Sequence, residues 1–203
     1  MLIVGLTGGI ASGKSTVARA LQSGPGMAVI DADRIAWETY QLGTEVYEKL
    51  VDHFGLRITN PDGTINRRAL GTIIFVDETE RSFVNHIVHP AVIARLKDLA
   101  RTYEAQGAEI LIVEAALLLE SEPVDRNFFD YYVMVKVDPE EQIRRLMARD
   151  GIDRDEALRR ISSQTSPDEK LRRADYVIES SGSPEGTVQR AKDLFAQLRQ
   201  LTK

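Results

Sequence analysis

The chain has 203 residues, a formal net charge of −5 at pH 7 and no cysteine. Its length suits one well-buried core with room for a smaller subdomain, and 43% hydrophobic with 28% charged residues is ordinary for a globular protein. The acidic balance argues against a nucleic-acid or anionic-membrane surface, because both require a net basic face. The absence of cysteine excludes disulfides and thiolate metal sites and favours a reducing compartment. No run approaches the roughly 20 apolar residues of a membrane span, and residues 2–6 lack a basic leader, so we expect a cytoplasmic protein.

Five apolar runs in this chain predict buried β-strands. Runs that are apolar without alternation are typical of parallel strands covered on both faces. Helical patterns separate the runs, starting with residues 14–22, where Val17, Ala18 and Leu21 fall on one face. This alternation predicts an α/β fold with a doubly wound, parallel five-stranded sheet. The predicted strands occupy residues 2–6, 27–31, the start of 110–120, 131–137 and 174–179.

The connection between the second and third strands, residues 32–109, is far longer than one crossover helix requires. The turn signal Asn-Pro-Asp-Gly at 60–63 divides it. A segment of this size suits a substrate-binding subdomain. Its helix-like stretches are residues 44–54, 67–75 and 90–106.

Residues 138–164 predict two amphipathic helices that meet at Gly151. Pro139 suits the first turn of the first helix, and glycine suits the stop after it. Asp153 with Glu156 has the spacing of a capping box at the start of the second helix.

The stretch GLTGGIASGKST, residues 5–16, concentrates glycines ahead of a lysine and a serine. It satisfies the pattern G-x-x-x-x-G-K-[ST], with a predicted strand before it and a predicted helix after it. Glycines let backbone N–H groups converge on an anion, and the helix directs the positive end of its dipole to the same point. The stretch therefore predicts a polyphosphate site, in which Lys14 reaches the β- and γ-phosphates and the Ser15 hydroxyl contacts Mg²⁺. The predicted nucleotide-binding residues, here called the phosphate loop, are Gly8, Gly9, Ile10, Ala11, Ser12, Gly13, Lys14, Ser15 and Thr16.

A nucleotide pocket alone leaves three classes of protein open: a small-molecule kinase, a GTPase-like switch, and an ATPase motor or chaperone module. Switch GTPases carry a base-reading motif of the N-K-x-D type, and this sequence has none. Motors and switches also need an acid that holds Mg²⁺ at the end of an apolar strand. Glu114, at the end of ILIVE, has the position of such an acid and equally that of a cap for a following helix.

The acid pair Asp31 and Asp33 favours the kinase. If the strand stays extended to this point, both carboxylates face the same way at the sheet edge where the phosphate loop lies. One can then take the proton of an attacking hydroxyl while the other orients a metal-bound water. The alternative is that Asp33 caps a helix beginning at Arg34.

Eight segments together are similar to the dephospho-CoA kinase family over essentially the whole chain. The phosphate loop is shared by many enzymes, whereas its combination with Asp-Ala-Asp, His-Pro and the late arginine-glutamine segment is specific. The segments are GLTGGIASGKST (5–16), DAD (31–33), NRRALGTIIF (66–75), IVHP (87–90), LLLE (117–120), RLMARDG (145–151), RRISSQ (159–164) and ADYVIE (174–179).

The resemblance implies transfer of the γ-phosphate of ATP to the 3′-hydroxyl of dephospho-CoA, the last step of coenzyme A synthesis, with Mg²⁺ as cofactor. A nucleoside or nucleotide kinase is the alternative within the same class, but its small acceptor leaves the long insert oversized. The implied parts are a P-loop kinase core at 1–33, 108–137 and 166–203, a helical CoA-binding insert at 34–107, and a lid at 138–165.

The resemblance also implies roles for individual residues. Asp33 becomes the general base, Lys14 the cation that bridges the phosphates, and Arg149 the lid arginine that closes on the transferring group. The implied substrate contacts are Asp31, Asp33, His89, Leu117 and Leu118.

The chain departs from the family's usual pattern at three places. Ala11 stands where glycine is more frequent, and the loop tolerates alanine if the φ of this residue stays negative. Residues 116–120 read Ala-Leu-Leu-Leu-Glu where the family often has Pro-Leu-Leu-Phe-Glu, which concerns the substrate groove. Ser180 or Ser181 replaces an asparagine after the last strand, which concerns the adenine contact.

The six arginines between residues 144 and 160 suit the charge neutralisation that phosphoryl transfer requires. Most have a simpler explanation, because Arg144, Arg145 and Arg149 fall late in a helix, where cations complement its dipole, while Arg159 and Arg160 face solvent. Arg149 is the one we expect to act, since it lies beside the Asp-Gly hinge.

The remaining polar and aromatic candidates favour structural roles. His86 and His89 lack a third ligand nearby, which disfavours a metal site. Pro90 predicts the start of a helix just after His89. Trp37 and Tyr40 either stack on a ligand or pack in the core.

Overall fold

The computed structural model describes residues 1–115 and 128–202. Its chain divides into two compact units, Met1–Asp31 with Ala100–Lys203, and Ala32–Leu99. We describe each unit by itself.

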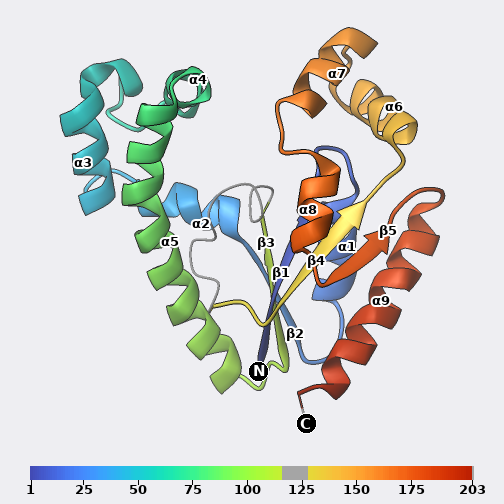
Figure 1. Cartoon of the computed structure of the whole chain (residues 1–203). Coiled ribbons are helices and arrows are strands. Elements are labelled where there is room, and N and C mark those ends of the chain that lie inside the picture. The colour runs from blue at the N-terminus through green and yellow to red at the C-terminus, as the bar shows by residue number, and fades with distance from the viewer. Residues whose placement is uncertain (116–127, 203) are drawn as a thin grey trace. The chain divides into compact units, whose positions relative to one another are not determined.

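The first unit contains a five-stranded sheet in which every paired strand is parallel to its neighbour (Figure 1). The strand order is β2-β3-β1-β4-β5, with β1 in the centre. This confirms the predicted doubly wound fold, and each predicted strand is present. The strands are β1 (Leu2–Gly8), β2 (Met27–Asp31), β3 (Ile110–Glu114), β4 (Tyr131–Lys136) and β5 (Tyr176–Glu179).

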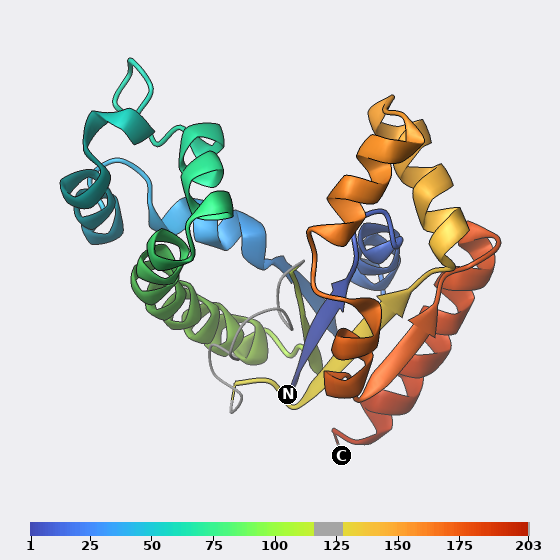
Figure 2. The same cartoon turned by 45° about the horizontal axis from the view of Figure 1, so that its top comes forward.

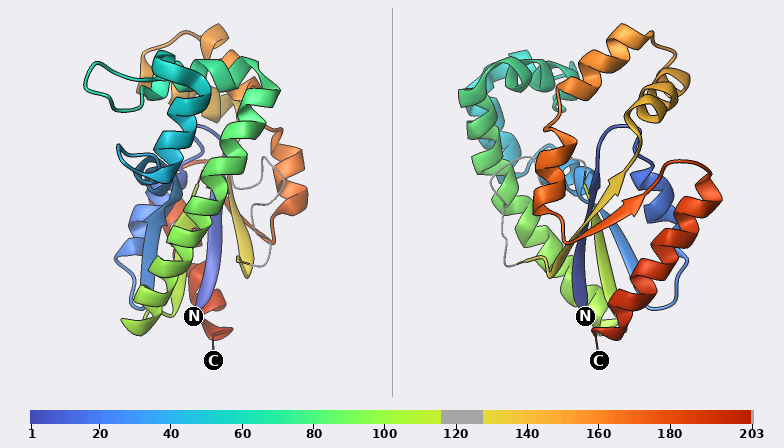
Figure 3. Two further views of the ribbon diagram at one scale, coloured as in Figure 1. Left: turned by 90° about the vertical axis from the view of Figure 1, so that its left-hand side faces the viewer. Right: turned by 45° about the vertical axis from the view of Figure 1, so that its right-hand side comes forward.

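Helices cover both faces of the sheet, which explains why its strands are apolar throughout. On one face, α1 (Lys14–Gln22) and α9 (Pro184–Gln200) lie side by side, as Figure 3 shows. On the other face, α8 (Pro167–Arg173) packs against β4 and lies in front of the sheet in Figure 1. The buried core under α1 and α9 comprises Val4, Leu6, Val17, Ala18, Leu21, Ile110, Ile112, Val133, Val135, Ile178, Ala191, Phe195 and Leu198.

The order of the strands creates a switch point between β1 and β3. The chain leaves β1 toward β2 on one side and leaves β3 toward β4 on the other side. In open α/β sheets, ligands bind outside the carboxyl ends of strands at such a point. The phosphate loop after β1 and Glu114 at the end of β3 both lie there, since Leu6 is paired with Glu114 in the register.

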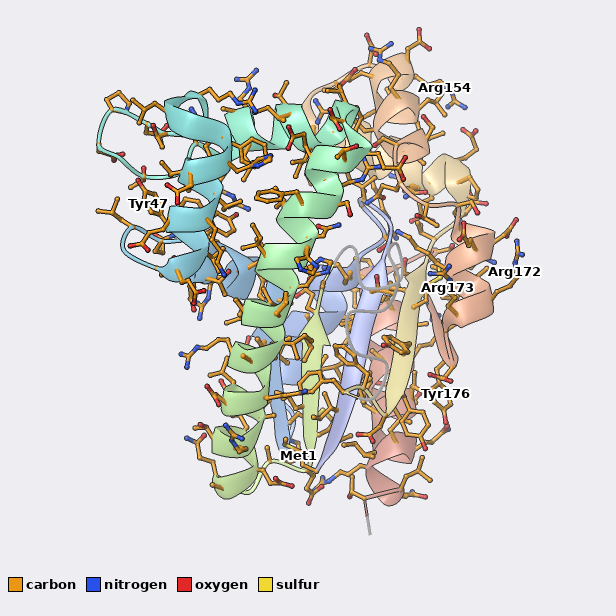
Figure 4. All side chains as sticks on the ribbon, turned by 60° about the vertical axis from the view of Figure 1, so that its left-hand side comes forward. Met1, Tyr47, Arg154, Arg172, Arg173 and Tyr176 are labelled. Carbon is orange, nitrogen blue, oxygen red and sulfur yellow. The ribbon has the colours of Figure 1, made fainter. Side chains whose placement is uncertain are left out.

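Two capped helices, α6 (Pro139–Asp150) and α7 (Arg154–Ser162), form the hairpin predicted for this segment, as Figure 2 shows. Asp153 accepts a hydrogen bond from Glu156 N, as the predicted capping spacing requires, and Gly151 ends α6 with a φ of 66°. Arg154, at the outer end of the hairpin in Figure 4, makes a two-bond ion pair with Glu140. The small core of the hairpin consists of Ile143, Leu146 and Ala157.

The second unit is helical around its own hydrophobic core. It holds α2 (Ala32–Thr39), α3 (Glu45–Phe54), the short 3₁₀ helix Gly55–Ile58, α4 (Arg67–Val76) and most of α5 (Glu78–Ala105). The helices α3 and α4 agree closely with the predicted stretches. The buried core residues are Val46, Leu50, Phe54, Ile58, Ile65, Leu70, Val84 and Val88.

The predicted helix start at Pro90 is wrong, because Pro90 lies inside α5. Proline removes one backbone hydrogen bond from a helix, which disfavours this position. Val84 and Val88 are buried in the core of the second unit on the preceding turns, so tertiary packing holds α5 continuous through the proline. Pro90 itself is exposed, where water can reach the backbone.

None of the helices among residues 1–115 and 128–202 combines the length and the apolar character that crossing a membrane would require.

Candidate active site

The phosphate loop turns sharply between β1 and α1, and glycine is required at two of its positions for different reasons. Gly13 has a φ of 91°, a conformation that favours glycine, and it immediately precedes α1. A Cβ at Gly8 would lie 2.5 Å from Ser12 Oγ and 2.7 Å from the Val135 carbonyl oxygen. Close packing against β4 therefore requires glycine at position 8, and backbone conformation requires it at position 13.

Ala11 does not keep the negative φ on which the expectation for this position depended. Its φ is +57°, the only such value at a non-glycine residue among those the structure describes. The left-handed conformation costs an alanine about 1–2 kcal/mol. The Ala11 side chain packs against the core of the α6/α7 hairpin, which offsets part of that cost.

Lys14 and Ser15 both contact Glu114 at the switch point. Lys14 Nζ and Ser15 Oγ each donate a hydrogen bond to Glu114 Oε1, at 2.8 Å. The ion pair is largely shielded, with each of the Lys14 and Glu114 side chains 13% exposed. Glu114 therefore faces the loop lysine and serine, while the segment that it could cap, residues 116–127, lies outside the described residues.

A cavity of about 870 Å³ opens over the phosphate loop. Every residue from Gly8 to Thr16 lines it, so the predicted nucleotide-binding residues lie together. Its remaining walls come from Arg19, from the α6/α7 hairpin and from the turn between β5 and α9. The cationic side chains around it are Lys14, Arg19, Arg144, Arg145 and Arg149.

Arg145 does more in this cavity than complement the dipole of its helix, which was the role predicted for it. Its Nη2 atom donates to the Ser180 carbonyl oxygen at 2.7 Å and to Glu141 Oε1 at 2.6 Å. The N–H of Gly182 donates to the other Glu141 oxygen at 3.0 Å. This bond, with support from Arg145, holds the pKa of Glu141 below its usual range. Arg145 thus connects its own helix, α6, to the turn after β5.

Arg149 lines the cavity and is held by its neighbour Asp150. Its Nε atom donates to Asp150 Oδ1 at 2.7 Å, and Arg160 Nη1 donates to Asp150 Oδ2 at 2.9 Å. The hydrogen bond from Arg149 is the main reason that the pKa of Asp150 lies below its usual range. Arg149 remains about half exposed, so an anion in the cavity can compete for it. Arg159 is largely exposed, as predicted.

The strand does not stay extended through the acid pair. β2 ends at Asp31 and α2 begins at Ala32, so Asp33 lies in the first turn of a helix. The two carboxylates therefore do not share one strand face, and the alternative helix start at Arg34 is also wrong. An acid in the first turn complements the helix dipole. Asp31 is paired in the register with Glu114, at the carboxyl edge of the sheet.

The remaining predicted residues fall in different places. His89 lies within α5, where burial lowers the pKa of its imidazole. Leu117, Leu118 and Ala116 lie outside the described residues. Trp37 and Tyr40 pack against the core of the second unit, with their rings edge to face at 5.3 Å, which is the packing alternative.

The contacts of Gln142 and Gln164 with the loop were not predicted from the sequence, and Ser180 was considered there only for an adenine contact. Ser180, fully buried, donates its hydroxyl to the Ser12 carbonyl oxygen. Gln142 and Gln164 contact the backbone of Ile10. Gln164 is the last residue of RRISSQ, a segment that supports the family resemblance but does not predict what Gln164 contacts. The motifs that resemble the family do not indicate that these side chains contact the phosphate loop.

Comparisons with known proteins point to one family. A family model described as dephospho-CoA kinase matches residues 2–185. A dephospho-CoA kinase of Geobacter sulfurreducens is 44% identical over 201 residues, which cover 97% of this chain and 98% of the relative. The solved dephospho-CoA kinase of Campylobacter jejuni is similar with a TM-score of 0.69 and 25% identity, covering 99% of this chain and 98% of its own. A solved Thermus thermophilus protein has a TM-score of 0.81 and 33% identity, with 97% of each chain covered.

Proposed function

This chain belongs to the dephospho-CoA kinase family, and from that membership we propose that it transfers the γ-phosphate of ATP to the 3′-hydroxyl of dephospho-CoA, giving coenzyme A. The observation that carries the proposal is the phosphate loop with Lys14 and Ser15 at the floor of an arginine-lined cavity. Phosphoryl transfer depends mainly on positioning and charge neutralisation, which such a cavity supplies.

The phosphate loop holds the triphosphate of ATP. Backbone N–H groups between Ala11 and Lys14 provide the anion nest, since alternating left-handed residues turn successive amides inward. The start of α1 adds the positive end of a helix dipole. When the nucleotide binds, the Lys14 ammonium leaves the Glu114 carboxylate and contacts the phosphates.

Ser15 and Glu114 fit a Mg²⁺ ion that accompanies the nucleotide. Both offer oxygen atoms, the ligands that Mg²⁺ prefers, and the two oxygens are 2.8 Å apart. Among residues 1–115 and 128–202 no three His, Asp or Glu side chains gather closely enough to hold a metal. Most ligands would therefore come from phosphate and water, with Ser15 contacting the ion directly. When bound, the ion neutralises negative charge on the β- and γ-phosphates.

The α6/α7 hairpin with its flanking residues, 138–165, acts as the lid. Arg149 leaves Asp150 and contacts the transferring phosphoryl group. The exchange costs little, because an exposed ion pair stabilises a protein by only about 0–1 kcal/mol. Arg160 keeps its own hydrogen bond to Asp150, so the carboxylate retains a cationic partner when Arg149 moves.

Asp33 is the general base that accepts the proton of the 3′-hydroxyl. The helical insert, residues 34–107, binds the acceptor, with further contacts from Asp31, Asp33, Leu117 and Leu118 and, within the insert, from His89. These roles rest on the resemblance of this chain's motifs to those of the dephospho-CoA kinase family. We propose a cytoplasmic location with them, and the absence of cysteine supports it because it suits a reducing compartment.

The proposal is tested by ADP release in a coupled assay with dephospho-CoA, AMP, UMP, nucleosides and water as acceptors. We expect turnover with dephospho-CoA to exceed that with every other acceptor. Turnover with AMP or UMP instead would identify a nucleotide kinase, and release with water alone would identify a regulatory ATPase. Lys14→Ala should impair ATP affinity and rate together, whereas the exposed Lys192→Ala on α9 serves as the unaffected control.

A further inference from the structure

Both backbone polar groups of Ile10 are occupied by glutamine side chains. Gln142 Nε2 donates to the Ile10 carbonyl oxygen at 2.7 Å, and Ile10 N donates to Gln164 Oε1 at 2.7 Å. Gln142 belongs to α6, and Gln164 follows the end of α7. Two segments far from the loop in sequence therefore grip a single residue at its tip. We call this arrangement the glutamine clamp.

The clamp is partly buried, Gln142 more so than Gln164, and apolar contacts reinforce it. Gln142 is only 7% exposed, although it lies on an otherwise strongly charged helix. Buried carboxamides need hydrogen-bond partners, and the loop carbonyl supplies one here. The side chains of Ile10 and Ala11 pack against the core of the α6/α7 hairpin. Ile10 is thus held by both hydrogen bonds and apolar packing, and Ala11 beside it by apolar packing alone.

The identity of Gly9 gives independent support for the clamp. A Cβ at this position would lie 2.9 Å from Gln142 Nε2 and 3.6 Å from Gln164 Oε1. The φ of Gly9 lies outside the left-handed region, so its backbone does not itself require glycine. The pattern G-x-x-x-x-G-K-[ST] also leaves this position free. A side chain at position 9 would have to displace the Gln142 carboxamide from its bond to Ile10, so glycine here suits the clamp.

The clamp lies next to the strained residue of the loop. Ala11, immediately after Ile10, has its φ at +57°. Conformations of this kind persist only where the surrounding structure determines them strongly. Fixing both peptide groups of Ile10 limits how Ala11 and the following amides can rotate. The orientation of the anion nest therefore depends on the two glutamines.

We propose that Gln142 and Gln164 are positioning residues that hold the phosphate loop in its nucleotide-binding conformation before ATP arrives. The clamp also couples the α6/α7 hairpin mechanically to the loop. This inference rests on the proposed use of the loop for ATP. Neither glutamine has to touch the nucleotide to act in this way.

The experiment uses the whole chain with methionine substitutions, which keep side-chain length and remove the hydrogen bonds. Amide hydrogen exchange at Ile10 is measured without nucleotide, and ATP affinity is measured by calorimetry. Gln164→Met should accelerate Ile10 exchange at least about 10-fold and weaken ATP binding about 10-fold, with the KM for dephospho-CoA unchanged. Gln142→Met should weaken ATP binding similarly. Gln189→Met, on the exposed surface of α9, is the matched control.

The polarity of the two bonds gives a sharper comparison. Gln164 is used as an acceptor, so Gln164→Glu should keep slow exchange at Ile10. Gln142 is used as a donor, so Gln142→Glu should not preserve the ATP affinity that Gln142→Met loses. The Gly9→Ala variant should weaken ATP binding, and adding it to Gln142→Ala should cause little further loss, because the clashing atom is gone.

Unchanged Ile10 exchange and ATP affinity in Gln164→Met would overturn the proposal. A lower melting temperature with normal ATP affinity would do so too, because it would assign the glutamines a merely structural role. Gln164 is less buried than Gln142, so its variant carries the test if Gln142→Met does not fold. The exchange measurement needs no acceptor, so it stands even if dephospho-CoA proves not to be the substrate.

Discussion

Glu114 and Lys14 form a shielded ion pair across the switch point of the sheet, with 2.8 Å between Oε1 and Nζ. The same carboxylate oxygen accepts the Ser15 hydroxyl. The two loop residues that the phosphate pattern singles out are therefore held by one acid at the end of the neighbouring strand. This acid competes with phosphate for Lys14 and offers oxygen to a metal ion.

These two effects of Glu114 can be separated by Glu114→Gln. In EDTA, we expect the variant to bind ATP about 3-fold more tightly, because the competing charge beside Lys14 is gone. With Mg²⁺ present, we expect kcat to fall by at least about 10-fold, since the carboxylate no longer helps to hold the ion. Calorimetry and the coupled assay measure the two quantities. If Glu114→Gln matches the exposed control Glu104→Gln in both, the role assigned to Glu114 is wrong.

Removal of the proposed base has a different signature. We expect Asp33→Asn to leave ATP binding nearly intact and to lower turnover by at least about 10²-fold, the usual scale for a lost general base. The steady-state rate with dephospho-CoA and the ATP dissociation constant are the measurements. Asp52→Asn, an exposed change on α3, controls for the lost charge. Near-normal turnover in Asp33→Asn would remove this residue from the role.

The strained alanine of the phosphate loop predicts an unusual stabilising change. Ala11→Gly should raise the free energy of unfolding by about 0.5–1 kcal/mol, because glycine adopts the left-handed conformation without a steric penalty. The lost methyl contact with the hairpin core limits the gain. Urea unfolding measures the difference. The same exchange at Ala196, exposed in α9, should instead destabilise by about 1 kcal/mol, and equal signs at both sites would contradict the assigned strain.

His89 predicts a specific dependence of stability on pH. Burial lowers the pKa of this imidazole from its ordinary 6.5, so the folded state binds its proton less readily than the unfolded state does. His89 therefore leaves the free energy of unfolding unchanged above pH 6.5 and lowers it as the pH falls below that value. We expect His89→Gln to reduce the loss of unfolding free energy between pH 7 and pH 5. The exposed His86→Gln is the matched control, and a larger loss in His89→Gln would contradict the burial effect.

The parts of the fold that follow from local sequence were predictable. Each buried strand is a continuous apolar run, and the phosphate loop follows from the spacing of Gly8, Gly13, Lys14 and Ser15. The helix stop at Gly151 and the cap at Asp153 also depend on neighbouring residues only. Such features need no knowledge of distant contacts.

The features that escaped prediction depend on contacts between distant segments. Gln142 reads as one more polar residue on a charged helix, yet it bonds to Ile10, 132 positions earlier. Lys170 on α8 is 1% exposed, against the ordinary preference of lysine for solvent. Pro90 broke the local rule for a helix start because the packing of α5 outweighs it. In each case tertiary structure decides against the local preference.

The most direct measurement identifies the bond that the enzyme forms. The wild-type chain is incubated with ATP, Mg²⁺ and dephospho-CoA, and the product is examined by ³¹P NMR spectroscopy and mass spectrometry. Our account predicts one new phosphomonoester on the ribose 3′-oxygen for each ADP released. Phosphate released to water, or a phosphoryl group on another position of the acceptor, would contradict it.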